Sequence, residues 1–177
     1  MVNLGKYLLV DGYNIINAWP KLKKIGATNL EEAREKLIED IVEYKHYTGE
    51  TVTIVFDAHL VKKSRMKKIN IKGVAIVFTK EYETADSYIE KRVEELTKNR
   101  KNQVRVATSD WAEQQVVLGS GATRISAREL NIEMEQVKKK IRIKTEETKK
   151  VRSTLEDRID SEIVEKLEKW RRSQGLS

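Results

Sequence analysis

The chain has 177 residues, of which 39% are hydrophobic and 36% are charged, and its formal net charge is +7. This length suits one domain, or one domain with an appendage. The positive net charge has two equally good interpretations: an anionic partner, such as nucleic acid or an acidic membrane surface, or a soluble protein with a charged, helix-rich surface. The absence of cysteine and the presence of only two histidines exclude disulfides, a thiol nucleophile and a cysteine-based zinc site, and they disfavour a Ser-His-Asp triad.

Five short apolar segments are predicted to be strands. Each is rich in β-branched residues and is bounded by turn residues. Their near-continuous hydrophobicity is typical of strands that are buried on both faces of a parallel sheet. The segments are 6–12, 51–58, 73–80, 103–110 and 121–126.

Helical periodicity fills the intervals between these strands. In the segment 28–47, Thr28 and Glu31 have the spacing of a capping box, and apolar residues recur on one face. Ser126 and Glu129 form a similar pair. The other helical segments are 84–99, 110–118 and 127–140. Alternating strands and helices predict an α/β fold, and right-handed crossovers place the carboxyl ends of the parallel strands at one edge of the sheet.

The C-terminal part of the chain has a different character. From Lys138 onward the sequence is highly charged, and we expect a final helix that starts at Ser153 with Glu156 completing its capping box. The apolar stripe of this helix is Leu155, Ile159, Ile163, Leu167 and Trp170. We therefore predict a domain at 1–135 and, at 136–177, a charged helical extension that packs its stripe on that domain.

The sequence contains no predicted targeting or membrane segment. The first apolar run, 7–10, is far too short for a signal peptide, and no longer apolar stretch follows. We expect a cytoplasmic protein that acts as a monomer and has no membrane partner.

Four aspartates lie at predicted strand ends. Asp11 and Asp57 close the first and second strands, and Asp110 follows the fourth. Asp86 lies on the first turn of the helix after the third strand. Ligands bind at the carboxyl edge in open α/β sheets, so these four carboxylates are predicted to share one site.

Gathering carboxylates at one edge has a physical cost that a cation removes. Two carboxylates about 4 Å apart repel each other by ~4 kcal/mol near a protein surface, and Mg²⁺ or Mn²⁺ prefers such oxygen ligands. Each aspartate also has a structural interpretation. Asp110 suits a helix N-cap, Asp86 the positive end of a helix dipole, and Asp57 a polar strand end. Asp11 is harder to explain in this way, because "VDGYN" reads as neither a hairpin turn nor a clear cap.

Four motifs together resemble the YacP-like NYN domain family, a branch of the PIN-like nucleases. They are "LLVDGYNIINAW", "VTIVFDAHLV", "VFTKEYETADSYIE" and "VRVATSDWAEQ", which occur in this order within roughly 6–130. The resemblance implies a PIN-like three-layer α/β/α fold with a mainly parallel sheet of about five strands and a C-terminal helical extension. It also implies a magnesium-dependent ribonuclease that cleaves messenger RNA on the ribosome.

Carried over by position, the catalytic centre of the family falls on Asp11, Asp57, Asp86 and Asp110. We predict that Asp11, Asp86 and Asp110 are the main ligands of Mg²⁺ or Mn²⁺, directly or through water, with Asp57 in support. Asn14 matches the asparagine of the family and is expected to orient water or phosphate. Supporting hydroxyl groups are expected at Thr84, Thr108 and Ser109. For Thr84, a helix N-cap is an equally good interpretation.

Basic and aromatic residues near the predicted edge are candidates for RNA binding. The segment between the second and third strands holds Lys62, Lys63, Arg65, Lys67, Lys68 and Lys72. In a loop at this place they could follow a phosphate backbone, although a solvated loop or helix is the plainer interpretation. Tyr13 and Tyr82 are the best candidates for stacking on bases. For the second basic run, 138–144, we favour a solvated surface.

These observations predict a metal-dependent endoribonuclease that acts on RNA, without a requirement for DNA. The alternative is a non-catalytic RNA- or ribosome-binding module on the same fold, against which the four acids argue, because pure RNA binding gains nothing from carboxylates facing phosphate. A phosphatase of the haloacid dehalogenase type needs a second aspartate two residues after Asp11, and position 13 is a tyrosine.

Overall fold

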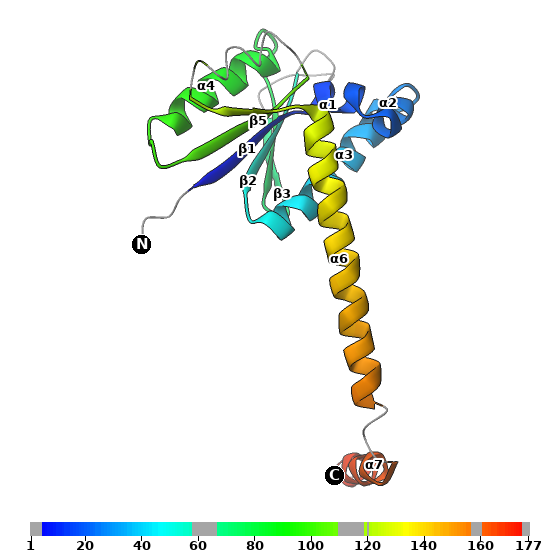
Figure 1. Cartoon of the computed structure of the whole chain (residues 1–177). Coiled ribbons are helices and arrows are strands. Elements are labelled where there is room, and N and C mark those ends of the chain that lie inside the picture. Colours follow the sequence, from blue (N-terminus) through cyan, green and yellow to red (C-terminus); the bar gives the residue numbers. More distant parts are fainter. Residues whose placement is uncertain (1–4, 58–66, 110–118, 120, 157–160, 175–177) are drawn as a thin grey trace. The chain divides into compact units, whose positions relative to one another are not determined.

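The computed structural model describes residues 5–57, 67–109, 119, 121–156 and 161–174 (Figure 1). The chain divides into two compact units, 1–137 and 138–177, just after the boundary predicted at 135. The first unit holds the sheet. Among the described residues, no helix is both long and apolar enough to cross a membrane.

The sheet of the first unit has six strands among the described residues, in the order β3-β4-β2-β1-β5-β6. The strands are β1 (Lys6–Asp11), β2 (Thr51–Phe56), β3 (Lys67–Ile71), β4 (Val74–Phe78), β5 (Gln103–Ala107) and β6 (Thr123–Ile125). All five predicted strands are present, and they pair in parallel. The mixed, mainly parallel sheet confirms the predicted fold class.

Strand β3 corrects the prediction of a basic loop or helix between the second and third predicted strands. It pairs antiparallel with β4 at the edge of the sheet. Because most of its residues are exposed, "KKINI" lacks the buried apolar run that marks the other strands.

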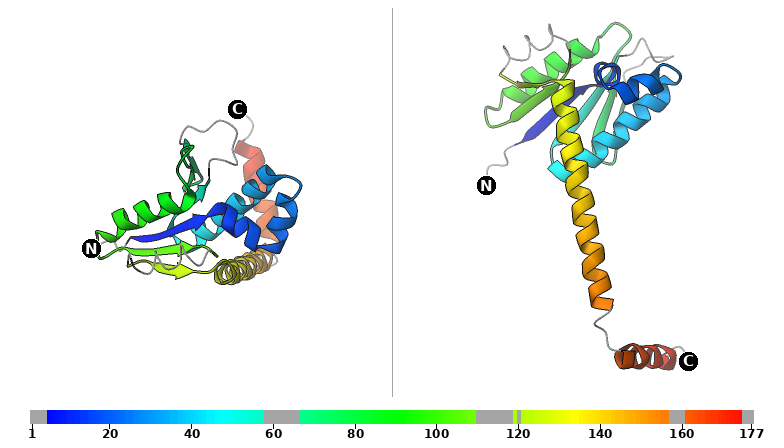
Figure 2. Two further views of the ribbon diagram at one scale, coloured as in Figure 1. Left: turned by 90° about the horizontal axis from the view of Figure 1, so that it is seen from above. Right: turned by 45° about the vertical axis from the view of Figure 1, so that its right-hand side comes forward.

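Helices cover both faces of this sheet. The helices of the described residues are α1 (Gly12–Ala18), α2 (Pro20–Gly26), α3 (Leu30–Thr48), α4 (Ala85–Thr97), α6 (Ala127–Glu156) and α7 (Ser161–Gln174), and α6 continues from the first unit into the second. On one face, Ile89 and Val93 of α4 pack on Leu9, Val55 and Val106 of three neighbouring strands. The opposite face is covered by α1, α3 and the start of α6, which gives the predicted three layers (Figure 2).

Side chains at the helix starts confirm one predicted capping box and correct another. Ser126 Oγ accepts from the backbone N–H of Glu129, whose carboxylate accepts in turn from the backbone N–H of Ser126. At α3, however, the N-cap is Asn29 and not Thr28. The Thr28 hydroxyl donates to the backbone carbonyl of Ile25 at the end of α2. Helix α2 is short and was not predicted from the sequence.

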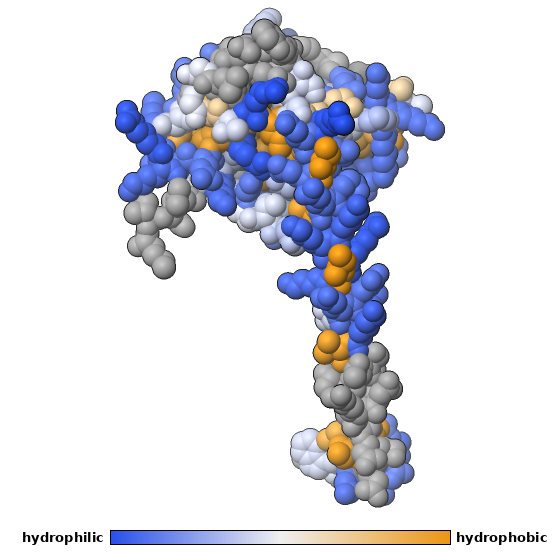
Figure 3. Space-filling model, viewed as in Figure 1, coloured by the Kyte–Doolittle hydropathy of each residue, from blue (hydrophilic) through white to orange (hydrophobic). Residues whose placement is uncertain are grey.

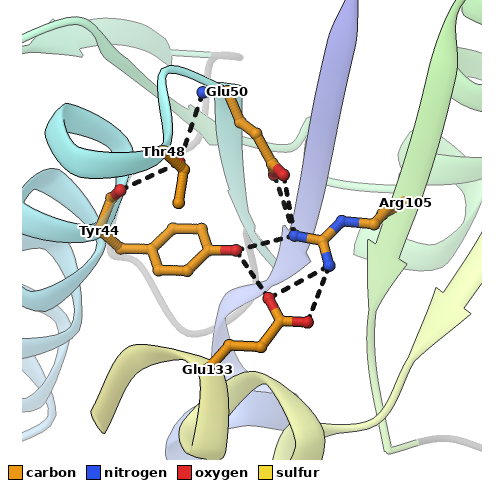
Figure 4. Close-up of polar contacts among 5 residues, drawn as sticks. All are labelled: Tyr44, Thr48, Glu50, Arg105 and Glu133. Carbon is orange, nitrogen blue, oxygen red and sulfur yellow. Dashed lines mark hydrogen bonds and ion pairs between the residues drawn. The ribbon is translucent and has the colours of Figure 1, made fainter. Parts of the chain in front are cut away.

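A polar network joins α3, β5 and α6 (Figure 4). Arg105 of β5 donates through Nη1 to Glu133 of α6 and through Nη2 to Glu50, at 3.0 Å in each case. The hydroxyl of Tyr44 accepts from Arg105 at 2.8 Å and donates to Glu133 at 2.7 Å. The network therefore attaches the start of α6 to the sheet.

The C-terminal helices differ from the prediction. Helix α6 continues through 153–156, so the predicted helix start at Ser153 is wrong, and the final helix begins at Ser161. The reason is local: the lysines, arginines and glutamates before Ser153 are good helix formers and no glycine or proline interrupts them. In α7, Ile163, Leu167 and Trp170 are exposed by 51%, 54% and 64%. Figure 3 shows separate apolar side chains on the mainly hydrophilic surface of this unit. That the stripe packs on the first unit stays a prediction.

Candidate active site

The carboxyl edge of the sheet brings the predicted acidic residues toward one another. Asp11 is the last residue of β1 and pairs in register with Val55 of the neighbouring strand β2, which Asp57 directly follows. Asp86 lies on the first turn of α4, which leaves the edge after β4. Asp110 lies outside the described residues.

Asp11 has a structural role that the sequence analysis missed. It is the N-cap of α1, its Oδ1 accepts from the backbone N–H of Asn14 at 3.2 Å, and it is only 8% exposed. The expectation that "VDGYN" is not a cap is therefore wrong. Helix α1 begins at Gly12, immediately after the strand, and is too short to show a helical apolar pattern in the sequence.

Asn14 links the chain after β1 to the chain after β5 at this edge of the sheet. Its Oδ1 accepts from the backbone N–H of Ser109 at 2.5 Å, just after β5. The backbone N–H of Asn14 donates to Oδ1 of Asp11. The bond from Ser109 occupies one lone pair of the amide oxygen, and the NH₂ group of Asn14 adds two donors that can serve water or phosphate. The structure thus shows Asn14 as a link between the turn after β1 and the residue that precedes Asp110.

The hydroxyl residues predicted to support the site differ in their surroundings. Thr108 is fully buried, and its backbone N–H donates to Ile125 at the end of β6. Ser109 is exposed. Thr84 is the N-cap of α4 and accepts from the backbone N–H of Ser87 at 3.1 Å, which is the structural alternative considered for it.

Tyr13 is not available for base stacking. It is only 8% exposed, and its ring meets the ring of Phe56 edge-on with the centroids 5.1 Å apart. The stacking prediction for Tyr13 is therefore wrong, because α1 turns this side chain into the core. A Cβ on the preceding Gly12 would collide with the ring of Phe56, so the close approach that glycine permits here is to an aromatic ring.

Tyr82 keeps its predicted availability. Its side chain is 97% exposed in the segment between β4 and α4, before Thr84 and Asp86. Within the same segment, Glu83 forms an ion pair with Lys91 of α4 at 2.9 Å. That pair holds the pKa of the Glu83 carboxyl below its usual value.

Part of the basic segment also reaches the edge. Lys67 opens β3 and pairs with Phe78, the last residue of β4, so the exposed Lys67 and Lys68 lie at the carboxyl end of β4. They lie on a strand and not in a loop. The candidates Lys62, Lys63 and Arg65 lie outside the described residues.

The described residues do not complete a metal site by themselves. Among them, no three carboxylate or histidine side chains are close enough together to hold a metal ion. The oxygen donors at the edge, Asp11, Asp57 and Asp86, are nevertheless of the chemical type that Mg²⁺ and Mn²⁺ bind. A three-carboxylate site at this edge therefore needs a residue beyond the described ones, and Asp110 is the candidate there.

One residue of this region was missed in the sequence analysis. Arg34 of α3 donates from Nη1 to the hydroxyl of Tyr13 at 2.9 Å. The signal was present in the predicted topology. A helix that leads into a parallel strand runs back along the sheet, so its first turns lie at the carboxyl edge.

Comparisons with known proteins agree with this architecture. Residues 8–172 match the model of the YacP-like NYN domain. The chain is 46% identical over 165 residues to the uncharacterized protein YacP of Bacillus subtilis, which covers 93% of this chain and 96% of the relative. It superimposes on the crystal structure of Rae1 (YacP) from Bacillus subtilis with a TM-score of 0.72, at 45% identity and 95% coverage of both chains. The crystal structure of a point mutant of that protein gives a TM-score of 0.73, with 82% of this chain and 84% of the mutant chain covered.

Proposed function

Because this chain belongs to the YacP-like NYN domain family and has its PIN-like nuclease fold, we propose that it is a metal-dependent endoribonuclease. The proposal rests on one observation: Asp11, Asp57 and Asp86 lie at the same edge of the sheet. The family resemblance extends the proposal to messenger RNA bound to the ribosome.

In this proposal, Asp11, Asp86 and Asp110 hold Mg²⁺ or Mn²⁺ with Asp57 in support. A bound divalent cation supplies charge stabilisation for the phosphoryl oxygens and lowers the pKa of water. The residues of the chain do the positioning. Asn14 keeps the start of α1, which Asp11 caps, next to the end of β5, because its Oδ1 accepts from the backbone N–H of Ser109.

Metal removal tests the proposal directly. We expect the purified chain to cut single-stranded RNA internally with Mg²⁺ or Mn²⁺ and to lose this activity in EDTA, with recovery when the metal is added back. Cleavage products are resolved on a denaturing gel, with free RNA and with RNA on ribosomes. Binding without any metal-dependent cut in either substrate would support the non-catalytic RNA-binding module instead.

Tyr82 provides a test of how RNA meets the edge. Because its ring is almost fully exposed, Tyr82→Ala should weaken binding of single-stranded RNA by about 1–3 kcal/mol, the value of one stacked base. Tyr82→Phe keeps the ring and should bind like the original protein. The matched control is Tyr47→Ala, at the end of α3 that faces the opposite edge, where the side chain is 45% exposed. Equal binding by all three variants would remove Tyr82 from the RNA path.

A further inference from the structure

Among the described residues, Arg34 makes one side-chain hydrogen bond, at the carboxyl edge. Helix α3 leads into β2 and runs antiparallel to it, so Arg34, in its early turns, lies toward the edge where β2 ends. The guanidinium Nη1 donates to the hydroxyl of Tyr13 at 2.9 Å. Tyr13 belongs to α1, which begins directly after Asp11.

Tyr13 is a rigid acceptor for this bond. Its buried ring packs edge-on against Phe56, the residue before Asp57. A tyrosine hydroxyl is neutral at pH 7 and can accept a hydrogen bond through its oxygen. The hydroxyl accepts from Arg34, while the ring is held against Phe56.

The guanidinium has donors to spare. Arginine carries five N–H donors in a planar fork. Within the described residues, the structure gives Arg34 one acceptor, the neutral hydroxyl of Tyr13, and no carboxylate. Arg105 differs, because Glu50 and Glu133 neutralise it. Arg34 is also partly exposed, so its positive charge remains open to an anion at the edge.

We infer that Arg34 binds a backbone phosphate of the RNA at the carboxyl edge and that Tyr13 positions the guanidinium for this contact. The inference rests on the proposed function, because it takes this edge as the place where RNA binds. A planar guanidinium fits a phosphate through two parallel hydrogen bonds, which a lysine cannot reproduce. The contact supplies binding and orientation but no base specificity.

The test measures binding of a fluorescently labelled single-stranded RNA in EDTA by anisotropy at several salt concentrations. Arg34→Gln should weaken binding roughly tenfold and lower the slope of log affinity against log salt by about 0.7, the value for one phosphate contact on a single strand. Arg34→Lys keeps the charge and should retain the salt slope with a smaller loss of affinity. Tyr13→Phe keeps the ring and removes the acceptor oxygen, so it should fall between Arg34→Gln and the original protein.

The control is Arg100→Gln, which removes the same charge from an exposed residue shortly before β5, at the opposite edge. It should bind RNA like the original protein. Equal affinity and equal salt slope for Arg34→Gln and Arg100→Gln would overturn the inference. Circular dichroism checks folding, and if Arg34→Gln does not fold, unchanged RNA affinity of Tyr13→Phe overturns the inference instead.

The two proposals fail in different ways. If the wild-type protein does not cut RNA with Mg²⁺ or Mn²⁺, the proposed function is overturned. The RNA-binding measurements in EDTA would still test the role of Arg34. Cutting by the original protein, together with RNA binding that ignores Arg34, would overturn only the inference about Arg34.

Discussion

Replacing Asp86 by Asn is expected to lower the rate of RNA cleavage by about two to three orders of magnitude. The loss of one carboxylate from a cation site removes several kcal/mol of transition-state stabilisation, and each 1.36 kcal/mol is a tenfold change in rate. The fold should persist, because Asp86 is exposed on the first turn of α4 and its favourable contact with the helix dipole is worth no more than about 1 kcal/mol. The measurement is kcat on labelled RNA with saturating Mg²⁺.

Two further variants make this result specific. Glu94→Gln makes the same change of charge at an exposed position in the last turns of α4, away from the edge, and should cleave normally. Asp11→Asn should also lose cleavage while it keeps its helix, because asparagine caps a helix about as well as aspartate. RNA binding in EDTA should survive in all three variants. Full cleavage by Asp86→Asn would remove Asp86 from the catalytic centre.

The buried strands of this fold were predictable and the edge strand was not. Strands β1 and β2 are buried on both faces, so their sequences are nearly continuous apolar runs that stand out from the helices around them. Strand β3 pairs on one side only and exposes most of its side chains, so "KKINI" reads as a charged loop. A run of apolar residues in the sequence reflects buried side chains, and an exposed edge strand has few of them.

The candidate site shows the same division. The edge that Asp11, Asp57 and Asp86 share follows from the direction of parallel strands alone. The hydrogen bonds that the side chains at this edge make do not follow from the strand direction. The bond between Asn14 and Ser109 joins residues 95 positions apart, and no local spacing predicts it. The cap at Asp11 was missed because α1 is only 7 residues long.

The network around Arg105 is a further contact that the sequence could not reveal. The pattern "QVRVA" shows an arginine within an apolar strand, which predicts that the charge needs partners but not which ones. The carboxylate partners are Glu50, just before β2, and Glu133 of α6, 55 and 28 positions away. Burial acts to lower the pKa of the Arg105 guanidinium, but its bonds to Glu133 and Glu50 outweigh this effect and leave the pKa raised. The guanidinium therefore stays charged at any working pH.

Removing this arginine is expected to have the largest effect on stability among these variants. Arg105→Met keeps much of the side-chain volume but leaves Glu50 and Glu133 as neighbouring carboxylates without their cation. The loss of one partner from a buried ion pair costs about 3–5 kcal/mol. Because the Arg105 and Glu133 side chains are 24% and 39% exposed, we expect a lower value of about 2–3 kcal/mol in the free energy of unfolding. Urea denaturation followed by circular dichroism measures it.

Charge compensation should distinguish the network from simple packing. Adding Glu50→Gln and Glu133→Gln to Arg105→Met removes the two repelling carboxylates, so the triple variant should recover part of the lost stability. Arg92→Met breaks an exposed pair with Glu95 and should cost less than about 1 kcal/mol. An Arg105→Met variant as stable as Arg92→Met would show that the network contributes little to stability. A triple variant no more stable than Arg105→Met would instead assign the loss to packing, and the attachment of α6 to the sheet would then depend on apolar contacts such as those of the buried Leu130 and Met134.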